Sequence, residues 1–313
     1  MTRHFLKDTD ITPQEQQQIL ALARTMKEDP YRFKPLSGPQ TVALIFDKTS
    51  TRTRVSFAAG VAELGGNPLL IDSQQSQLGH KESIADTART LSRMVSAIVW
   101  RTYSQAGLED MAQHATVPVI NSLSDDFHPC QILADLLTLQ ERFGELAGKT
   151  FTYIGDAANN MANSYLLGGA TAGMHVRICG PEKYLPQPHI VAQAEERAQQ
   201  TGGSILITAN PEEALKNTDA VITDTWISMG QEEEAETRKK IFMPYQVDEK
   251  AMAQAAPNAV FLHCLPAYRG YEVTESVIDG PQSVIWDEAE NRVHAQKALL
   301  NFLLESDTVP SAA

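Results

Sequence analysis

Short runs of apolar, often β-branched residues alternate along the whole chain with stretches of helical periodicity. Several runs are apolar at every position, which is typical of parallel strands covered by helices on both faces. The alternation predicts an α/β fold of doubly wound parallel sheets. The runs expected to form strands are Val42–Phe46, Pro68–Ile71, Ala97–Trp100, Val117–Ile120, Phe151–Ile154, Val176–Cys179, Ile205–Thr208, Ala220–Thr223, Val260–Leu262 and Val284–Trp286.

The helical stretches and the glycines between them predict two domains. A chain of 313 residues is too long for one ordinary core. Apolar residues recur at helical spacing over Ile132–Phe143, and Gly144 and Gly148 then interrupt the pattern. We expect two doubly wound domains, residues 1–130 and 149–288, joined by interdomain helices, with the active site in the cleft between them. The last amphipathic stretch, about 290–305, is expected to pack back on the first domain.

Polar clusters follow many of the expected strands. Ligands bind at the carboxyl ends of strands in open α/β sheets, so these clusters are expected to outline one cleft. The clusters are Ser50–Arg54, Arg101–Thr102, Asn121–Gln131, Gly155–Asn160, Asp224–Gly230 and His263–Pro266.

The segment Ser50–Arg54 is predicted to bind an anion. It follows a strand and opens the helical stretch Val55–Leu64, so backbone N–H groups and hydroxyls converge at a helix N-terminus. Arg52 and Arg54 add forked donors that suit phosphate. Basic side chains in the first turn of a helix are unfavourable unless an anion offsets the helix dipole.

Arg101 and His128 also stand at strand ends and have donors for a ligand. Pro129 takes the favoured first position of a helix, so His128 lies at a helix N-terminus. The dipole there is expected to lower the pKa of His128, and a neutral imidazole can still donate to a carbonyl oxygen.

The second half of the chain has residues for a different ligand. Asn159 and Asn160 could donate to a carboxylate, and Asp224 suits an ammonium group. Cys264 is a candidate nucleophile beside His263, but adjacent strand residues point to opposite faces, so a covalent thiol mechanism is not expected. The turn at Gly155 lacks the G-x-G-x-x-G spacing, which argues against a nicotinamide dehydrogenase.

Composition excludes several classes of partner. There are 26 basic and 39 acidic residues, a net charge of −13 that disfavours nucleic acid. The apolar runs are too short to cross a membrane, and the N-terminus shows no secretory signal. Three widely spaced cysteines without metal-ligand spacing fit a reduced, cytoplasmic chain.

Taken together, these segments resemble the ornithine carbamoyltransferases of the aspartate/ornithine carbamoyltransferase family. The resemblance covers nearly the whole chain, and the motifs occur in the family's order. They are Ser50–Arg54, His128–Gln131, Asp224–Gly230, Phe261–Pro266, Trp286–Arg292 and Val293–Ala298.

The resemblance implies transfer of the carbamoyl group of carbamoyl phosphate to the δ-amine of L-ornithine, in arginine biosynthesis, without a metal or organic cofactor. Thr53, Arg101, His128 and Cys264 would be catalytic. Carbamoyl phosphate would be bound by Ser50, Thr51, Arg52, Thr53, Gln77, Arg101, His128, Gln131, Cys264, Leu265 and Arg292. Ornithine would be bound by Asn160, Asp224, Ser228 and Met229.

The resemblance also implies a homotrimer in which Gln77 reaches a neighbouring subunit's site. The chain departs from the common family pattern at a few positions. Ala58 or Ala59 stands where an acidic residue is common, Tyr268 where histidine is common, and His80-Lys81 where an arginine-led pair is common. None of these positions is assigned to a substrate.

Two alternatives remain at this stage. A sister carbamoyltransferase could use putrescine, N-acetylornithine or aspartate. Asp224 with Ser228–Gly230 favours an acceptor that has a free α-amino group, which disfavours N-acetylornithine and aspartate. A non-catalytic anion-binding protein would be expected to lack part of the chemistry, and every assigned position is filled.

Overall fold

The computed structural model describes residues 2–72, 82–227 and 232–306. The chain forms two compact units. Unit 1 comprises Met1–Leu137 and Glu290–Ala313, and unit 2 comprises Thr138–Ala289. The divisions fall inside two helices, α5 (Pro129–Phe143) and α12 (Ile285–Ser306), so each of these helices belongs to both units.

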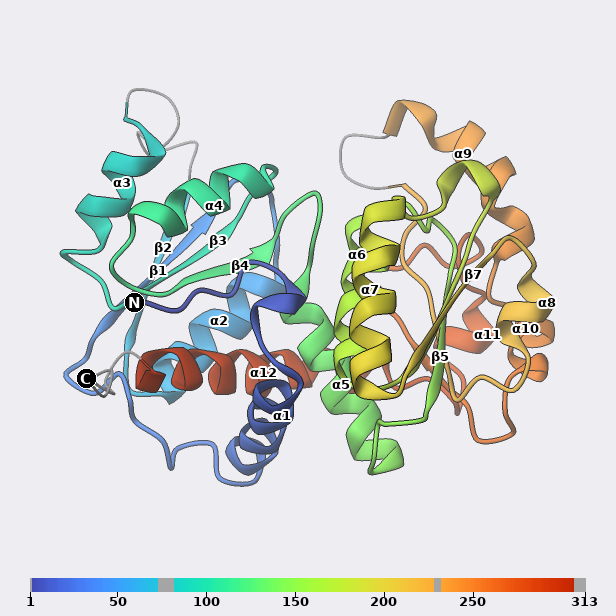
Figure 1. Ribbon diagram of the computed structural model, residues 1–313, viewed down its shortest axis with the longest axis horizontal. Coiled ribbons are helices and arrows are strands. Elements are labelled where there is room, and N and C mark those ends of the chain that lie inside the picture. Colours follow the sequence, from blue (N-terminus) through green and yellow to red (C-terminus); the bar gives the residue numbers. More distant parts are fainter. Residues whose placement is uncertain (1, 73–81, 228–231, 307–313) are drawn as a thin grey trace. The chain divides into compact units, whose positions relative to one another are not determined.

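Unit 1 is built on a four-stranded sheet in which every pairing is parallel. The strand order is β2-β1-β3-β4. The strands are β1 (Thr41–Phe46), β2 (Asn67–Asp72), β3 (Ala97–Arg101) and β4 (Val119–Leu123). Helices α3 (Ile84–Leu91) and α4 (Gln105–His114) cover one face, where Ile45, Ile98 and Leu108 share a buried cluster. Helices α1 (Pro13–Glu28), α2 (Arg52–Glu63) and α12 lie on the other side of this sheet (Figure 1).

A buried lysine fastens α12 to the rest of unit 1. The Lys297 side chain is fully buried, and its Nζ lies 2.5 Å from Glu63 Oε2 at the end of α2. The same nitrogen donates to the backbone carbonyls of Met26 and Pro30, at 3.4 and 3.1 Å. Because a buried charge is costly unless it is paired, these contacts fix the position of α12 on unit 1.

Unit 2 is built on a five-stranded parallel sheet with the order β7-β6-β5-β8-β9. Its strands are β5 (Thr150–Ile154), β6 (His175–Cys179), β7 (Ser204–Thr208), β8 (Ala220–Ile222) and β9 (Val260–Leu262). Its helices are α6 (Asn160–Thr171), α7 (Pro188–Thr201), α8 (Pro211–Leu215), α9 (Ala235–Phe242), α10 (Glu249–Gln254) and α11 (Glu275–Ile278). Helices α6 and α7 lie on one side of this sheet, and α8, α10 and α11 on the other (Figure 1). The short 3₁₀ helices of the described residues are η1 (Asp8–Asp10), η3 (Glu182–Tyr184), η4 (Glu232–Glu234) and η5 (Met243–Tyr245).

Local sequence signals explain where several helices begin. Thr12 and Glu15 form a capping box at α1, and Pro13 is its first residue. Ser83 and Ser104 accept backbone N–H groups at the starts of α3 and α4. Each cap satisfies one of the N–H groups that lack a partner inside the helix.

The predicted α/β fold with two doubly wound parallel sheets is confirmed, but one predicted strand is wrong. Val284–Trp286 does not form a strand, because α12 begins at Ile285 and only Ser283 makes an isolated bridge to Phe261. Asp287 and Glu288 lie in the first turn of α12, where acidic side chains favour a helix. A short apolar run cannot by itself distinguish a strand from a buried helix start.

The strand orders place a topological switch point in each unit. In unit 1 it lies between β1 and β3, whose last residues, Phe46 and Arg101, are register partners. In unit 2 it lies between β5 and β8. Ligands of such sheets bind outside the carboxyl ends of the strands at this point. Within the described residues, no helix has the length and apolar character needed to span a membrane.

Candidate active site

A positively charged cluster lies at the carboxyl ends of the unit 1 strands. Lys48 follows β1, Arg101 ends β3, His128 precedes α5, and Arg292 comes from α12. All four side chains are buried. Burial, together with Arg292, Arg101 and Lys48, holds the pKa of His128 well below its usual range. The imidazole is therefore neutral at pH 7, in a positive local field that attracts anions.

Thr53 and Arg292 are held together inside this cluster. Arg292 Nη2 donates to Thr53 Oγ1 at 2.9 Å, and both residues are buried. Thr53 N–H donates to Ser50 Oγ at 3.2 Å, so Ser50 caps the start of α2. Thr51 is exposed and Arg52 is half-buried, which leaves both accessible at this helix N-terminus. The residues predicted to bind an anion thus lie at the start of α2, and Arg292 of α12 contacts one of them.

The spacing of the motif predicts that Arg54 contacts the anion, but in the structure Arg54 has other partners. Its guanidinium lies over the Phe46 ring, 4.5 Å from the ring centre, and 3.9 Å from Asp72 Oδ2. Arg52 remains the basic residue of the motif that is available at the start of α2.

Gln131 and Cys130 are on the first turn of α5. Gln131 Nε2 donates to Asp135 Oδ1 at 2.8 Å, and both side chains are buried. Cys130 donates from Sγ to the Asn121 carbonyl, and burial raises the pKa of its thiol to about 12. Cys130 is therefore an inert core thiol.

In unit 2, a buried ion pair connects the turns after β5 and β8. Arg238 of α9 pairs with Asp156, and both side chains are buried. Arg238 Nε donates to the Trp226 carbonyl at 2.5 Å. Burial raises the pKa of Asp156, although the Arg238 charge opposes this shift. Gly155 allows the turn after β5 to approach Trp226 closely, because a Cβ at this position would lie 3.2 Å from Trp226 Nε1.

The turn after β5 also orients two asparagines. Asn159 Oδ1 accepts the Ala162 N–H and caps α6, while its Nδ2 donates to Tyr153 Oη at 2.9 Å. Asn160 is the first residue of α6 and is half-buried. Burial and the nearby Asp224 and Asp156 raise the pKa of Tyr153, so its hydroxyl stays protonated.

Cys264 lies against Asp224. Its Sγ donates to Asp224 Oδ1 at 3.3 Å, whereas the His263 ring contacts Glu272 and the Leu265 N–H. Both ring nitrogens of His263 are engaged, by Glu272 and by the Leu265 N–H, so this arrangement does not form a Cys–His nucleophile. One ligand atom from each of Asp224, His263 and Cys264 lies within 4.8 Å of the others. A metal ion could use all three only if His263 lost one of its hydrogen bonds.

Three predicted substrate residues lie outside the described residues: Gln77, Ser228 and Met229. The pair His80-Lys81 lies outside them as well. The remaining predicted residues divide between the two units. These residues are Ser50, Thr51, Arg52, Thr53, Arg101, His128, Gln131 and Arg292 in unit 1, and Asn160, Asp224, Cys264 and Leu265 in unit 2.

Three comparisons with known proteins identify the family. The model of the aspartate/ornithine carbamoyltransferase carbamoyl-P binding domain matches residues 3–141, and that of the Asp/Orn binding domain matches residues 147–303.

The chain belongs to the aspartate/ornithine carbamoyltransferase family.

Its curated relatives include an ornithine carbamoyltransferase of Renibacterium salmoninarum, 63% identical over 97% of this chain and 99% of the relative. One from Mycobacterium ulcerans is 55% identical over 97% of this chain and 99% of the relative. The solved ornithine carbamoyltransferase from Pyrococcus furiosus has a TM-score of 0.94 and 46% identity, covering 99% of this chain and 98% of that chain. The solved anabolic ornithine carbamoyltransferase from Campylobacter jejuni has a TM-score of 0.90 and 39% identity, and the match covers 97% of this chain and 99% of that chain.

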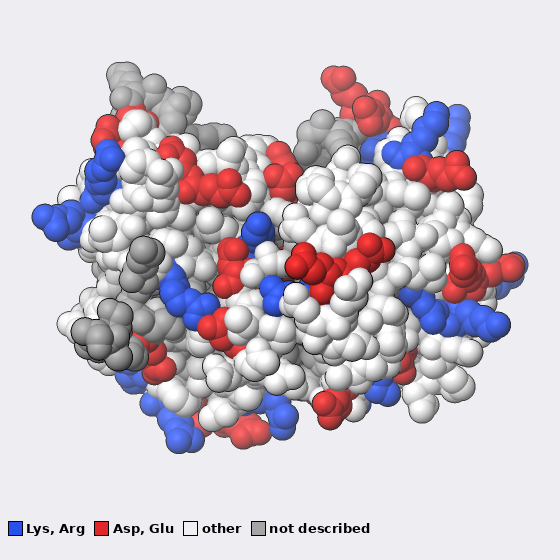
Figure 2. Space-filling view, viewed as in Figure 1, with Lys and Arg blue, Asp and Glu red and all other residues white. Residues whose placement is uncertain are grey.

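The structure adds residues to which the sequence pattern assigned no role. Lys48 pairs with Asp125, and its Nζ lies 4.3 Å from the centre of the Tyr103 ring. The one signal for Lys48 in the sequence is its position shortly after β1, with Asp47 between. The sequence contains no signal for Arg238, because its partner Asp156 is 82 residues away. On the face shown in Figure 2, basic and acidic side chains are interspersed.

The buried state of His128 predicts how its protonation affects stability. An unfolded histidine takes up a proton near pH 6.5, whereas folded His128 resists it, so acid favours the unfolded chain. We expect the free energy of unfolding to fall as the pH is lowered from 7.5 to 5.5, by at most about 1.4 kcal/mol per pH unit from this group. His128→Gln should remove that part of the slope. Urea unfolding of the wild type and the variant at several pH values measures this slope. The same dependence of the free energy of unfolding on pH in both proteins would mean that His128 titrates normally.

Proposed function

We propose that this chain transfers the carbamoyl group of carbamoyl phosphate to the δ-amine of L-ornithine, giving L-citrulline and phosphate in arginine biosynthesis. The observation that carries the proposal is the set of buried cations around neutral His128 at the unit 1 switch point. It suits a small, highly charged anion, and the family's domain name supplies carbamoyl phosphate. Relatives with 55–63% identity are named for the same reaction.

The proposed donor site assigns the phosphate to the start of α2. Ser50, Thr51, Arg52 and Thr53 would contribute hydroxyls, amides and a forked guanidinium, and Arg292 would add charge beside Thr53. Gln131, Cys264 and Leu265 are assigned to carbamoyl phosphate from the family resemblance.

The proposed reaction is direct attack by the δ-amine. The neutral amine attacks the carbamoyl carbon, and negative charge develops on the carbonyl oxygen. Thr53, Arg101 and His128 would donate to this oxygen, and each such donor is typically worth about 3–4 kcal/mol of transition-state stabilisation. The C–O bond to phosphate then breaks, phosphate leaves toward Arg52, and the proton lost by the amine nitrogen ends on the departing phosphate. Binding both substrates together lowers the barrier further by proximity.

The acceptor is assigned to unit 2. Asp224 would bind the α-ammonium group, and Asn160, Ser228 and Met229 complete the set implied by the resemblance. The Cys264 thiol donates to Asp224, which supports its role as a positioning and lining residue and not as a covalent carrier. A carboxylate at Asp224 favours an acceptor with a free ammonium group, which N-acetylornithine lacks. Putrescine differs from ornithine by the missing α-carboxylate, to which Asn160 would donate. The proposal requires no metal and no organic cofactor.

We further propose that the protein acts as a cytoplasmic homotrimer whose sites are shared. Strand β2 is an edge strand, and Leu69 and Leu70 in it remain 44% and 45% exposed. Val55 on α2 is 61% exposed. Exposed apolar residues on an edge strand favour association with another chain. The resemblance makes Gln77, which follows β2 in sequence, the residue donated to the neighbour. Free buried Cys130 and Cys179 fit a reducing compartment.

The acceptor assignment predicts a ranking of substrates. With carbamoyl phosphate as donor, ornithine should be carbamoylated with a higher kcat/KM than putrescine, N-acetylornithine or aspartate. Asp224→Asn should lower kcat/KM for ornithine by about 100-fold, because a charge-assisted contact to the α-ammonium group is lost, and should affect N-acetylornithine, which has no such ammonium, much less. Asp279→Asn, a surface carboxylate paired with Arg269, is the matched control and should behave as wild type. Preference of the wild type for putrescine would refute the acceptor assignment.

Sharing of sites predicts complementation between two inactive variants. Arg101→Ala damages the receiving site, and Gln77→Ala damages the donated loop. When the two are unfolded and refolded together in equal amounts, about a quarter of the sites should combine a sound site with a sound loop. Activity of the mixture should exceed the mean of the separately refolded parents. The contrary result requires that the Gln77→Ala parent is itself impaired and that native mass spectrometry detects mixed trimers. If the activity of such a mixture did not exceed the mean of the parents, each site would be built by one chain.

A further inference from the structure

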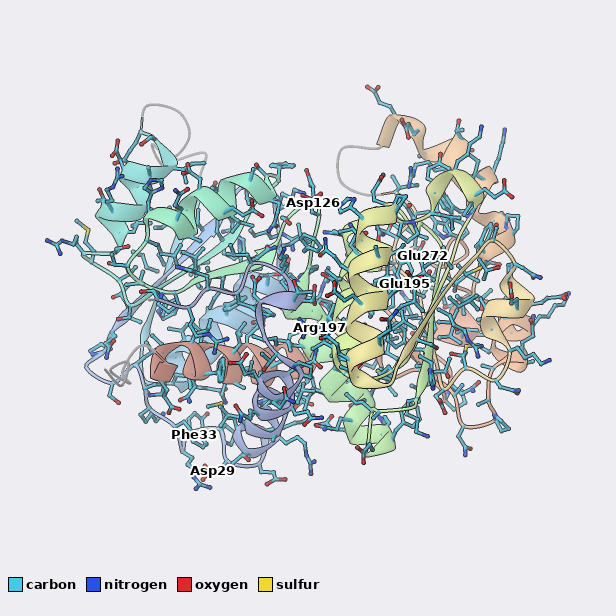
Figure 3. All side chains as sticks on the ribbon, in the orientation of Figure 1. Asp29, Phe33, Asp126, Glu195, Arg197 and Glu272 are labelled. Atoms are coloured by element: carbon cyan, nitrogen blue, oxygen red, sulfur yellow. The ribbon has the colours of Figure 1, made fainter. Side chains whose placement is uncertain are left out.

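A chain of hydrogen bonds runs behind the segment Cys264–Leu265 in unit 2. The Leu265 N–H donates to His263 Nδ1 at 2.9 Å. His263 Nε2 lies 3.2 Å from Glu272 Oε1, and the Tyr268 N–H donates to the same oxygen at 2.6 Å. The side chains of His263 and Glu272 are both fully buried. In Figure 3, Glu272 is labelled within unit 2.

The directions of these hydrogen bonds fix the protonation of the ring. Nδ1 accepts the Leu265 N–H, so it has no proton of its own. Nε2 therefore has the proton and donates it to Glu272. The carboxylate thus selects the imidazole tautomer that can accept from Leu265. This is how an acidic partner orients a histidine in many active sites, although here the imidazole serves a backbone amide.

Leu265 is in a conformation that needs such support. Its φ is +59°, in the left-handed region that side chains with a Cβ rarely adopt. Conformations of this kind persist only where the surroundings determine them, and they occur most often at binding and catalytic sites. The His263 ring is one determinant, and the His263 backbone N–H is itself held by buried Glu288 at 2.9 Å.

Burial of this pair is costly for the stability of the fold. Within the described part of the chain, Glu272 Oε2 is buried and has no hydrogen-bond partner. An apolar pair of similar volume would avoid the cost of burying these polar groups. The arrangement is therefore better explained by a requirement for orientation than by stability.

We propose that His263 and Glu272 are a positioning pair that holds Cys264 and Leu265 in the conformation needed to bind carbamoyl phosphate. The inference rests on the proposed function, which assigns Cys264 and Leu265 to that substrate. His263 and Glu272 themselves act through Leu265 and do not contact the reacting atoms.

Variants of Glu272 separate orientation from charge. Glu272→Gln keeps an acceptor oxygen for His263 and Tyr268, whereas Glu272→Leu removes it. We expect Glu272→Leu to raise the KM for carbamoyl phosphate by about 10- to 100-fold, since a misplaced binding group costs this much, with a smaller change in kcat. Glu272→Gln should stay within about threefold of wild type.

A control distinguishes this effect from a general loss of stability. Thr152 in β5 is buried, and its hydroxyl donates to the Ala214 carbonyl at 2.7 Å, within unit 2. Thr152→Val removes one buried hydrogen bond and should lower the Tm without changing the KM for carbamoyl phosphate. An equal rise of KM in Thr152→Val and Glu272→Leu would overturn the positioning role.

Variants of His263 test the other end of the chain, including the case in which Glu272→Leu does not fold. The side-chain oxygen of Asn can replace Nδ1, whereas the amide of Gln extends to the level of Nε2. His263→Asn should therefore bind carbamoyl phosphate about tenfold more tightly than His263→Gln, the effect of one retained hydrogen bond. Equal KM values for the two variants would contradict the proposal.

A spectroscopic measurement makes the test independent of activity. In ¹⁵N-histidine-labelled wild-type protein, His263, assigned by its loss in His263→Asn, should show a protonated Nε2 and a bare Nδ1. A protonated Nδ1 would overturn the positioning pair. Absence of citrulline formation by the wild type would instead refute the proposed function, and the tautomer would still report on the pair.

Discussion

Parallel pairing of β1 with β3, and of β5 with β8, is the constraint on which the rest of the structure depends. The register aligns Phe46 with Arg101, so the segments after β1 and β3 leave the sheet at the same edge. Lys48, Arg101 and the start of α2 therefore lie at the same edge of the sheet. Arg292 joins them because the buried Lys297, five residues further along α12, fastens that helix to α1 and α2. The same logic in unit 2 brings Asp156 and Asp224 to neighbouring strand ends.

The two sites use buried charge in opposite ways. In unit 1 three basic side chains surround a histidine that stays neutral, so the cluster attracts an anion and retains a hydrogen-bond donor. In unit 2 two buried carboxylates pair with a side chain that can donate: Asp156 with Arg238, and Glu272 with His263. These pairs orient turns that carry half-buried residues, Asp224 and Cys264 among them. Charge in unit 1 therefore serves binding directly, whereas much of it in unit 2 serves orientation.

Much of this arrangement is predictable from the sequence, for reasons that are local. Continuous apolar runs such as Val42–Phe46 predict buried parallel strands, and polar clusters that follow them predict the ligand edge. The prediction for Val284–Trp286 fails because three apolar residues are compatible with a strand or a helix start. The lowered pKa of His128 was expected from the helix dipole, yet burial and the neighbouring cations are its main causes. Arg238 could not be found, because its role exists only once distant segments are folded together. Glu272 lies only nine residues from His263, but no local sequence pattern shows that the chain between them brings the two side chains into contact.

The central claim is that one chain binds a carbamoyl phosphate group at the start of α2 and an α-amino acid at Asp224. A crystal structure with a bisubstrate analogue, in which a phosphonoacetyl group is joined to the δ-nitrogen of ornithine, tests it most directly. The account predicts the phosphonate on Arg52 and Thr53, the amide oxygen facing Arg101 and His128, and the α-ammonium on Asp224. A phosphonate bound away from α2, or an α-ammonium that does not meet Asp224, would contradict it.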